Sequence, residues 1–332
     1  MSTDDIHDDL TQRTENAPVE LLTRSFFFLC AVLSVVTTLS IVVLLTTEAA
    51  KFFSITAPLM NVEGATASVV DFLTGTTWII NNQQFGVLSL VSATLLITLG
   101  AAVVALPLGV ATAIYLSEYA TERARSVLKP ALEVLAGVPT VVYGFFALVY
   151  LTPVLELVFP SIGTFNILSA SIIVGIMIIP MVASISEDAM SAVPESLRQA
   201  GYGMGATKFD VSTGIVVPAS LSGIFSSFIL ALSRAIGETM AVTIAAGAQA
   251  NFLNPIGVGT VFGVPIPYPD LSVYLEGALP MTAAMVQLRT GDVTGGGLAY
   301  RSIFAIGLLL FLITLVMNII SDIVAQRYRE EY

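Results

Sequence analysis

Six runs of this chain contain no charged residue and are each long enough to cross a lipid bilayer as a helix, which takes about 20 apolar residues. A soluble domain has about 25% charged residues, whereas only 11% of these 332 residues are charged and the mean hydropathy is +0.88. The first run is too long for a signal peptide and no small-residue cleavage site follows it. The sequence therefore predicts an all-α integral membrane protein of six transmembrane helices, with spans at residues 26–47, 88–116, 134–155, 165–186, 211–233 and 302–321.

The distribution of Lys and Arg predicts how these spans are oriented, because cytoplasmic segments of membrane proteins are enriched in both. If the N-terminus is cytoplasmic, the inner segments hold nine of these residues and the outer segments hold three. We therefore expect both termini in the cytoplasm. The inner set is Arg13, Arg24, Arg123, Arg125, Lys129, Arg198, Lys208, Arg327 and Arg329, and the outer set is Lys51, Arg289 and Arg301.

The segments outside the spans indicate the organisation of the chain. Residues 1–24 form an acidic tail with six Asp or Glu residues, and residues 25–50 form the first transmembrane helix. The tail explains much of the net charge of −11, with salt adaptation as the alternative. The outer loop at about 252–300 is rich in Pro and Gly, so it cannot be one long helix. Prolines within the spans favour helices that pack in a bundle, where neighbours satisfy the freed carbonyl groups.

The residue inventory excludes most catalytic chemistry. The single cysteine, Cys30, rules out an intramolecular disulfide, and the single histidine, His7, lies in the tail. The segment from Gly201 to Lys208 is glycine-rich but lacks the Gly-Lys-Ser/Thr order of a phosphate-binding P-loop. We expect a chain with no catalytic residue, no metal, no cofactor of its own and no nucleic-acid partner.

A polar segment between the fourth and fifth runs is predicted to dock another protein. Pro194 suits the start of a helix and Glu195 suits its first turn. The small residues at 200, 201 and 205 would leave a face that another backbone can approach closely. A plain helix–turn connector is the alternative. The predicted docking residues are Leu197, Gln199, Ala200, Gly201, Met204 and Gly205.

Two charged residues, Arg234 and Glu238, interrupt an apolar stretch after the fifth run. One such charge at the centre of a membrane helix costs roughly 2.5–3.5 kcal/mol on insertion scales. Their spacing of four residues predicts that they share one helix face and pair. Either they form a structural ion pair, or they handle an anion, since a guanidinium matches phosphate oxygens in a bidentate fork.

These motifs resemble those of ABC importer permeases. The segment Gln199-Ala200-Gly201, then Gly205, then Ile215 to Pro218 matches the spacing of their docking loop, with Gln199 and Gly201 in place of the usual Glu and Ala. The stretch from Arg234 to Thr243 resembles the signature of the PstC family, the permease subunits of high-affinity phosphate ABC importers. Met240-Ala241-Val242 favours this family over the sister PstA family. Residues 84–86, 107–119 and 137–146 resemble the family too.

The resemblance implies a type I ABC importer (MetI-like) permease fold over residues 86–324, with a docking loop at about 187–215. It implies a multi-pass protein of the plasma membrane, surrounded by lipid, that imports inorganic phosphate. Its implied partners are a PstA-type sister permease, a PstB-type ATPase dimer that binds the ATP, and a PstS-type phosphate-binding protein. Arg234 and Glu238 would lie on the phosphate pathway. The alternatives are a permease for molybdate or sulfate, and a stand-alone ion-coupled carrier or channel.

Overall fold

The computed structural model describes residues 17–53, 67–261, 264–290 and 297–327 of the chain. Within these ranges, four helices are long and apolar enough to cross a membrane, and two bent helix pairs bring the number of spans to as many as six. The membrane-spanning helical fold is therefore confirmed. The continuous helices are α2 (Ala17–Phe52), α5 (Leu88–Ile114) with the π-helical turn η2 (Tyr115–Tyr119), α9 (Ile167–Ser191) and α16 (Leu298–Arg327).

Two of the predicted spans, 134–155 and 211–233, are not single straight helices. The first is bent by 88° between α6 (Glu122–Gly137) and α7 (Thr140–Phe146), where Pro139 interrupts the helical backbone. Proline has no N–H to continue the hydrogen-bond ladder. The second is bent by 68° at Ser220. It consists of α11 (Lys208–Val211), η4 (Ser212–Val216), α12 (Val217–Ala219) and α13 (Leu221–Ile236).

The core of the protein is the contact between α5 and α9. Small residues allow the two backbones to approach closely, as an added methyl group at Gly109 would lie 2.6 Å from the side chain of Val182. An added methyl at Gly175 would lie 2.9 Å from Val104 in the same way. Pro107 and Pro180 lie inside these two helices, which remain continuous because the bundle surrounds them.

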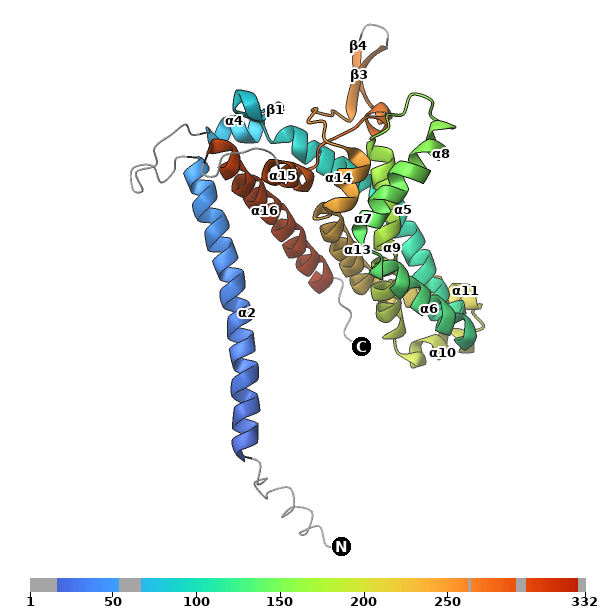
Figure 1. Ribbon diagram of the computed structural model, residues 1–332. Helices are drawn as coiled ribbons and strands as arrows, with labels where there is room; N and C mark the ends of the chain where they lie inside the picture. Colours follow the sequence, from blue (N-terminus) through green and yellow to red (C-terminus); the bar gives the residue numbers. More distant parts are fainter. Residues whose placement is uncertain (1–16, 54–66, 262–263, 291–296, 328–332) are drawn as a thin grey trace.

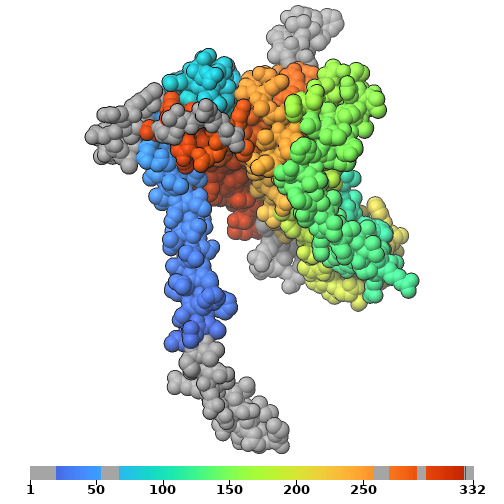
Figure 2. Space-filling view, in the orientation of Figure 1, coloured from blue at the N-terminus to red at the C-terminus, as the bar shows by residue number. Residues whose placement is uncertain are grey.

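In contrast, α2 lies largely apart from the bundle (Figures 1 and 2). None of the most apolar part of this helix is buried within the chain. Its C-terminal end packs on α16, where Leu45 lies beside Gly307. The apolar residues of α2 are therefore available to lipid or to another subunit. The acidic residues predicted for the tail before Ala17 lie outside the described part of the chain.

Short elements cover the side of the bundle opposite to the N-terminal end of α2 (Figure 1). As predicted, the loop from 252 to 300 is not one long helix. It forms an antiparallel hairpin, a 3-10 turn and a further helix, and this hairpin and a smaller one are exceptions to the all-α prediction. The elements are α4 (Val69–Thr74), β1 (Trp78–Ile79), η1 (Ile80–Asn82), β2 (Gln84–Phe85), α14 (Met240–Ala246), β3 (Ile256–Val261), β4 (Val264–Pro269), η5 (Leu271–Leu275) and α15 (Met281–Thr290). The bundle is completed by η3 (Ala147–Leu151), α8 (Thr152–Glu156) and α10 (Glu195–Gly203).

The first and last described helices, α2 and α16, run in opposite directions (Figure 1). The start of α2 lies on the same side of the bundle as α10 and α11, and α16 runs towards that side (Figure 1). The hairpin β3–β4 lies on the opposite side. We refer below to the side of α10 as the inner side. That this side is cytoplasmic remains a prediction.

Candidate transport and docking sites

Arg234 and Glu238 do not lie on one helix face, so this prediction from their spacing is wrong. Helix α13 ends at Ile236, and Glu238 lies in the break before α14. Among the residues that the structure describes, no carboxylate oxygen lies within 4.0 Å of the Arg234 guanidinium. The two charges are therefore close in sequence but serve different local structures.

Glu238 is held by the backbone around the break. Its side chain accepts a hydrogen bond from the backbone N–H of Ala241 at 3.2 Å, in the first turn of α14. Its carbonyl oxygen accepts a bond of 2.7 Å from the hydroxyl of Thr282 in α15. The residue is only 9% exposed. Glu238 thus joins the end of α13 to α14 and α15.

Arg234 occupies the last turn of α13 and is exposed on the surface of the single chain. A positive charge complements the negative end of the helix dipole there, which is the structural role of this residue. The hydroxyl of Tyr143 in α7, the first half-helix of the other bent span beyond its break, donates to the carbonyl of Leu135 at 2.6 Å, which fixes its orientation. The guanidinium of Arg234 therefore presents a positive charge that has no ion-pair partner among the described residues.

The predicted docking segment forms α10, and its end explains one of the predicted residues. The N–H groups of Gly205 and Ala206 donate to the carbonyls of Tyr202 and Gly201, respectively, at 3.0 and 3.1 Å. This pair of bonds ends a helix when the residue after the cap is left-handed, and Gly205 has φ = +84°. Glycine adopts this conformation without steric cost. The turn directs the chain into α11, whose capping box was not predicted.

The predicted docking residues divide between the surface and the interior. Gln199, Ala200, Met204 and Gly205 are exposed, with Met204 82% exposed. Leu197 is half-buried against the apolar residues of α11 and η4.

Gly201 was expected to give close access to another protein, and this is wrong. Gly201 is buried, and an added methyl group there would lie 2.7 Å from Ile215 and 2.9 Å from Val211. The small size of Gly201 allows α10 to pack closely on α11 and η4, which follow it in the chain. Two aromatic residues that were not predicted, Tyr202 of α10 and Phe209 of α11, are also exposed, as Met204 is. The loop therefore exposes large apolar side chains on the inner side.

Two buried carboxylates at the inner ends of the spans pair with cations of α10 and α6. Arg198 of α10 lies 2.7 Å from Glu118 of η2, whose side chain is 4% exposed. Arg125 of α6 forms an ion pair with Glu187 of α9, and Lys129 lies 2.6 Å from the same carboxylate. The side chain of Glu187 is 1% exposed.

The sequence interpretation used these Arg and Lys residues only to orient the chain. The sequence nevertheless contained a pattern that indicates these ion pairs. Glu118 and Glu187 lie within two residues of the inner ends of the predicted spans at 88–116 and 165–186. A carboxylate at such a position is held close to the membrane core, where it needs a cation nearby.

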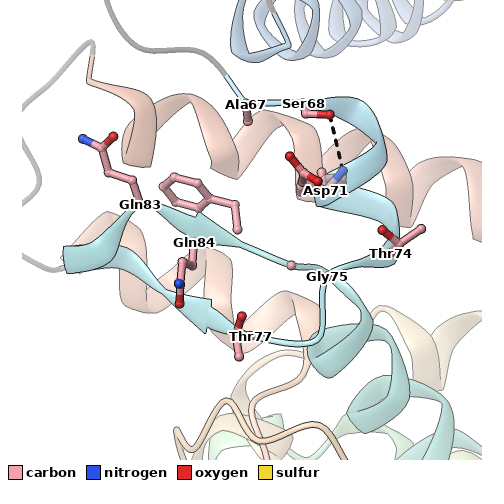
Figure 3. Close-up of a pocket in the computed structure, with 11 residues that line it drawn as sticks. Ala67, Ser68, Asp71, Thr74, Gly75, Thr77, Gln83 and Gln84 are labelled. Atoms are coloured by element: carbon pink, nitrogen blue, oxygen red, sulfur yellow. Dashed lines mark hydrogen bonds between the residues drawn. The ribbon is translucent and has the colours of Figure 1, made fainter.

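A polar pocket of ≈ 380 Å³ lies on the outer side, within the unit formed by α4, β1, η1 and β2 (Figure 3). Its lining includes Asp71, Thr74, Thr77 and Gln84. Ser68 caps α4 by accepting from the backbone N–H of Asp71 at 3.5 Å. None of the predicted site residues lines this pocket.

A bundle of continuous and bent membrane spans, with the largely exposed helix α10 on the inner side, is the architecture expected of a membrane permease subunit of a transport system. The chain belongs to the family described as "Binding-protein-dependent transport system inner membrane component", which matches residues 105–330. This confirms the predicted permease family and the membrane location.

Individual relatives extend over most of the chain. It is 29% identical over 310 residues to the probable ABC transporter permease protein YqgH of Bacillus subtilis, covering 91% of each chain. It is 31% identical over 275 residues to the phosphate transport system permease protein PstC of Mesorhizobium japonicum, covering 77% of this chain and 78% of the relative. Among solved structures, an inward-facing conformation of the MetNI methionine ABC transporter is similar with a TM-score of 0.50 at 15% identity, over 74% of this chain and 94% of that one. This last similarity supports the fold alone.

Proposed function

We propose that this chain is the PstC-type permease subunit of an ATP-driven importer of inorganic phosphate. Several relatives that align with most of it, including those of Mesorhizobium japonicum and Haemophilus influenzae, are named phosphate transport system permease proteins. In this proposal the pore forms together with a PstA-type sister permease. A relative named phosphate transport system permease protein PstA 1, from Mycobacterium tuberculosis, is 31% identical over 189 residues, as expected of a related sister subunit.

The observation that carries the proposal is the uncompensated guanidinium of Arg234. A charge at membrane depth is costly, and no carboxylate oxygen in the described part of the chain lies within 4.0 Å of this guanidinium. An oxyanion offers the planar pair of acceptors that a guanidinium matches with two parallel hydrogen bonds. Glu238 adds a fixed negative charge four residues further on, which prevents a deep electrostatic trap for the anion. Phosphate would therefore bind briefly at Arg234 and leave.

A separate ATPase supplies the energy in this proposal, since the chain has no P-loop. The exposed apolar residues Tyr202, Met204 and Phe209 form the surface that enters a complementary apolar recess of a PstB-type dimer. Apolar side chains at the centre of an interface contribute most of its binding energy. A PstS-type binding protein delivers phosphate at the opposite, outer side.

The docking proposal is tested by cross-linking in a cysteine-free background. Cys30 is the single cysteine of the chain, so Cys30→Ala provides this background. A cysteine introduced at the exposed Ala200 should cross-link to the ATPase subunit. A cysteine at Ser68, which is exposed on the outer side, is the matched control and should not. A cross-link from Ser68 and none from positions 197–205 would contradict docking at α10.

The transport proposal is tested in proteoliposomes that contain the complete transporter with its binding protein. We expect phosphate uptake that requires ATP and is unchanged by an excess of sulfate or molybdate. Competition by those anions would favour a permease for another oxyanion. Phosphate flux through this chain alone, without ATP, would favour a carrier or channel.

A further inference from the structure

Arg198 points from the docking helix into the protein, although α10 is otherwise rich in exposed residues. Its side chain is 11% exposed. One terminal nitrogen lies 2.7 Å from Glu118 Oε1, and the other donates to the carbonyl of Met190 at 2.7 Å. A single guanidinium therefore joins α10 to η2 and to the inner end of α9.

The chemistry of this contact makes it rigid. The guanidinium is a planar fork with fixed donor directions, and bonds between charged partners are shorter and stronger than neutral ones. Glu118 is itself held, because Ser117 donates to the same carboxylate oxygen at 3.0 Å. A second polar contact also joins the loop to η2, since Lys208 Nζ lies 5.1 Å from the centre of the Tyr119 ring.

The elements that Arg198 joins continue into the transport core. The turn η2 extends α5 without a break, and α5 packs along the length of α9. Helix α9 is in turn bonded to α13, because the hydroxyls of Ser186 and Ser227 lie 2.8 Å apart. An added methyl at Gly223 of α13 would lie 2.3 Å from Ala189 of α9. The last turn of α13 carries Arg234.

We propose that Arg198 is the positioning residue that transmits movement of the docking helix to the core, with Glu118 as its acceptor. Apolar contacts hold α10 against α11 and η4, the two elements that follow it in the chain. Such contacts have no fixed direction, so they tolerate sliding. The charged fork fixes the position of α10 relative to α5 and α9, so a displacement of α10 displaces both helices. The inference rests on the proposed function, because the displacement comes from the ATPase.

The test measures phosphate uptake and ATP hydrolysis together in proteoliposomes containing the complete transporter and its binding protein. The variants are Arg198→Met, Glu118→Gln and the charge-exchanged pair Arg198→Glu with Glu118→Arg. The control is Glu133→Gln, because Glu133 is an exposed carboxylate of α6 that has no ion pair among the described residues and lies outside the docking helix. We expect the ratio of phosphate transported to ATP hydrolysed to fall at least tenfold in both single variants. The exchanged pair should recover part of this ratio, and the control should retain it.

Three results would overturn the inference. The first is an unchanged ratio in Glu118→Gln. The second is a parallel loss of uptake and hydrolysis together with loss of the copurifying ATPase, which would assign Arg198 to docking. The third is loss of assembly in Arg198→Met and also in the milder Arg198→Lys, which would assign the pair to folding. Absence of ATP-driven phosphate uptake by the unmodified transporter would instead refute the proposed function, so the two failures are distinguishable.

Discussion

Replacement of Arg234 tests the anion site most directly, and its effect can be worked out from the structure. Two parallel hydrogen bonds from a guanidinium to an oxyanion contribute about 1.5–3 kcal/mol each. Arg234 is exposed in the single chain, where water competes for these bonds, so the lower figure applies. Arg234→Gln should therefore weaken the interaction with phosphate by about 3 kcal/mol, or about 100-fold, since each 1.4 kcal/mol is a factor of ten.

Arg234→Lys should have a smaller effect, because an ammonium group keeps the charge and loses the fork. Loss of one of the two bonds, about 1.5 kcal/mol, predicts a decrease of about tenfold. The assay is the initial rate of phosphate uptake into proteoliposomes at phosphate concentrations below saturation. Arg123→Gln is the control, since Arg123 is an exposed cation of α6 on the inner side, and its uptake should remain unchanged.

The transporter should still assemble when Arg234 is replaced. Arg234 has no ion pair within the described residues and is not buried, so its replacement leaves no orphaned partner. Uptake by Arg234→Gln within threefold of the unmodified transporter would refute the anion site. Loss of the assembled complex would also refute it, and would assign Arg234 to holding subunits together.

Two further predictions concern stability and are measured by thermal unfolding in detergent. Replacing both Arg125 and Lys129 by Met leaves the buried Glu187 charge without a cation and with only a hydrogen bond from the Ser191 hydroxyl, which should cost about 3 kcal/mol, and adding Glu187→Met should recover at least 1 kcal/mol of this. No recovery in the triple variant would contradict a desolvated charge at this position. Gly201→Val should destabilise the protein by about 1–3 kcal/mol through overpacking, whereas Gly203→Val should cost less, because nothing lies within 4 Å of a methyl added there. Equal effects at the two glycines would show that α10 does not pack as described.

The positions of the apolar spans could be predicted from the sequence, but their shape could not, since four are continuous helices and two are bent pairs. Apolar runs fix how many segments suit the bilayer core, and all six runs lie in helices or bent helix pairs. Prolines do not locate the bends. Pro139 lies at a break, while Pro107 and Pro180 lie inside continuous helices. One missing N–H is a local loss, and packing decides whether the helix survives it. The tight contact between α5 and α9 preserves both helices.

At the candidate sites, features that depend on neighbouring residues could be predicted from the sequence, and contacts between distant residues could not. The exposure of Met204 and the turn at Gly205 agree with the local pattern, because both depend on residues close in sequence. The pairing of Arg234 with Glu238 failed because a helix was assumed to continue past Ile236. The contact of Glu238 with Thr282 stabilises the break instead, and it joins residues 44 positions apart. The link between Arg198 and Glu118 joins residues 80 positions apart, beyond the reach of any local rule.

The continuous and the bent spans have different roles in this architecture. The continuous helices α5 and α9 form the packed core, and buried carboxylates at their inner ends receive the cations of α6 and α10. The bent spans carry Tyr143 and Arg234, and each of them begins in an element on the inner side, at α6 or α11. A bend is a natural place for a change of angle, since fewer backbone bonds cross it. In the proposed mechanism, movement of the docking loop would therefore act on Arg234 by two routes. It would shift the core as a unit through Arg198, and it would change the angle at Ser220, where α12 meets α13. Both routes end at α13, because α9 is bonded to α13 through Ser186 and Ser227 and the bend at Ser220 leads directly into it. The charge in the last turn of α13 and the ion pairs on the inner side would then act together.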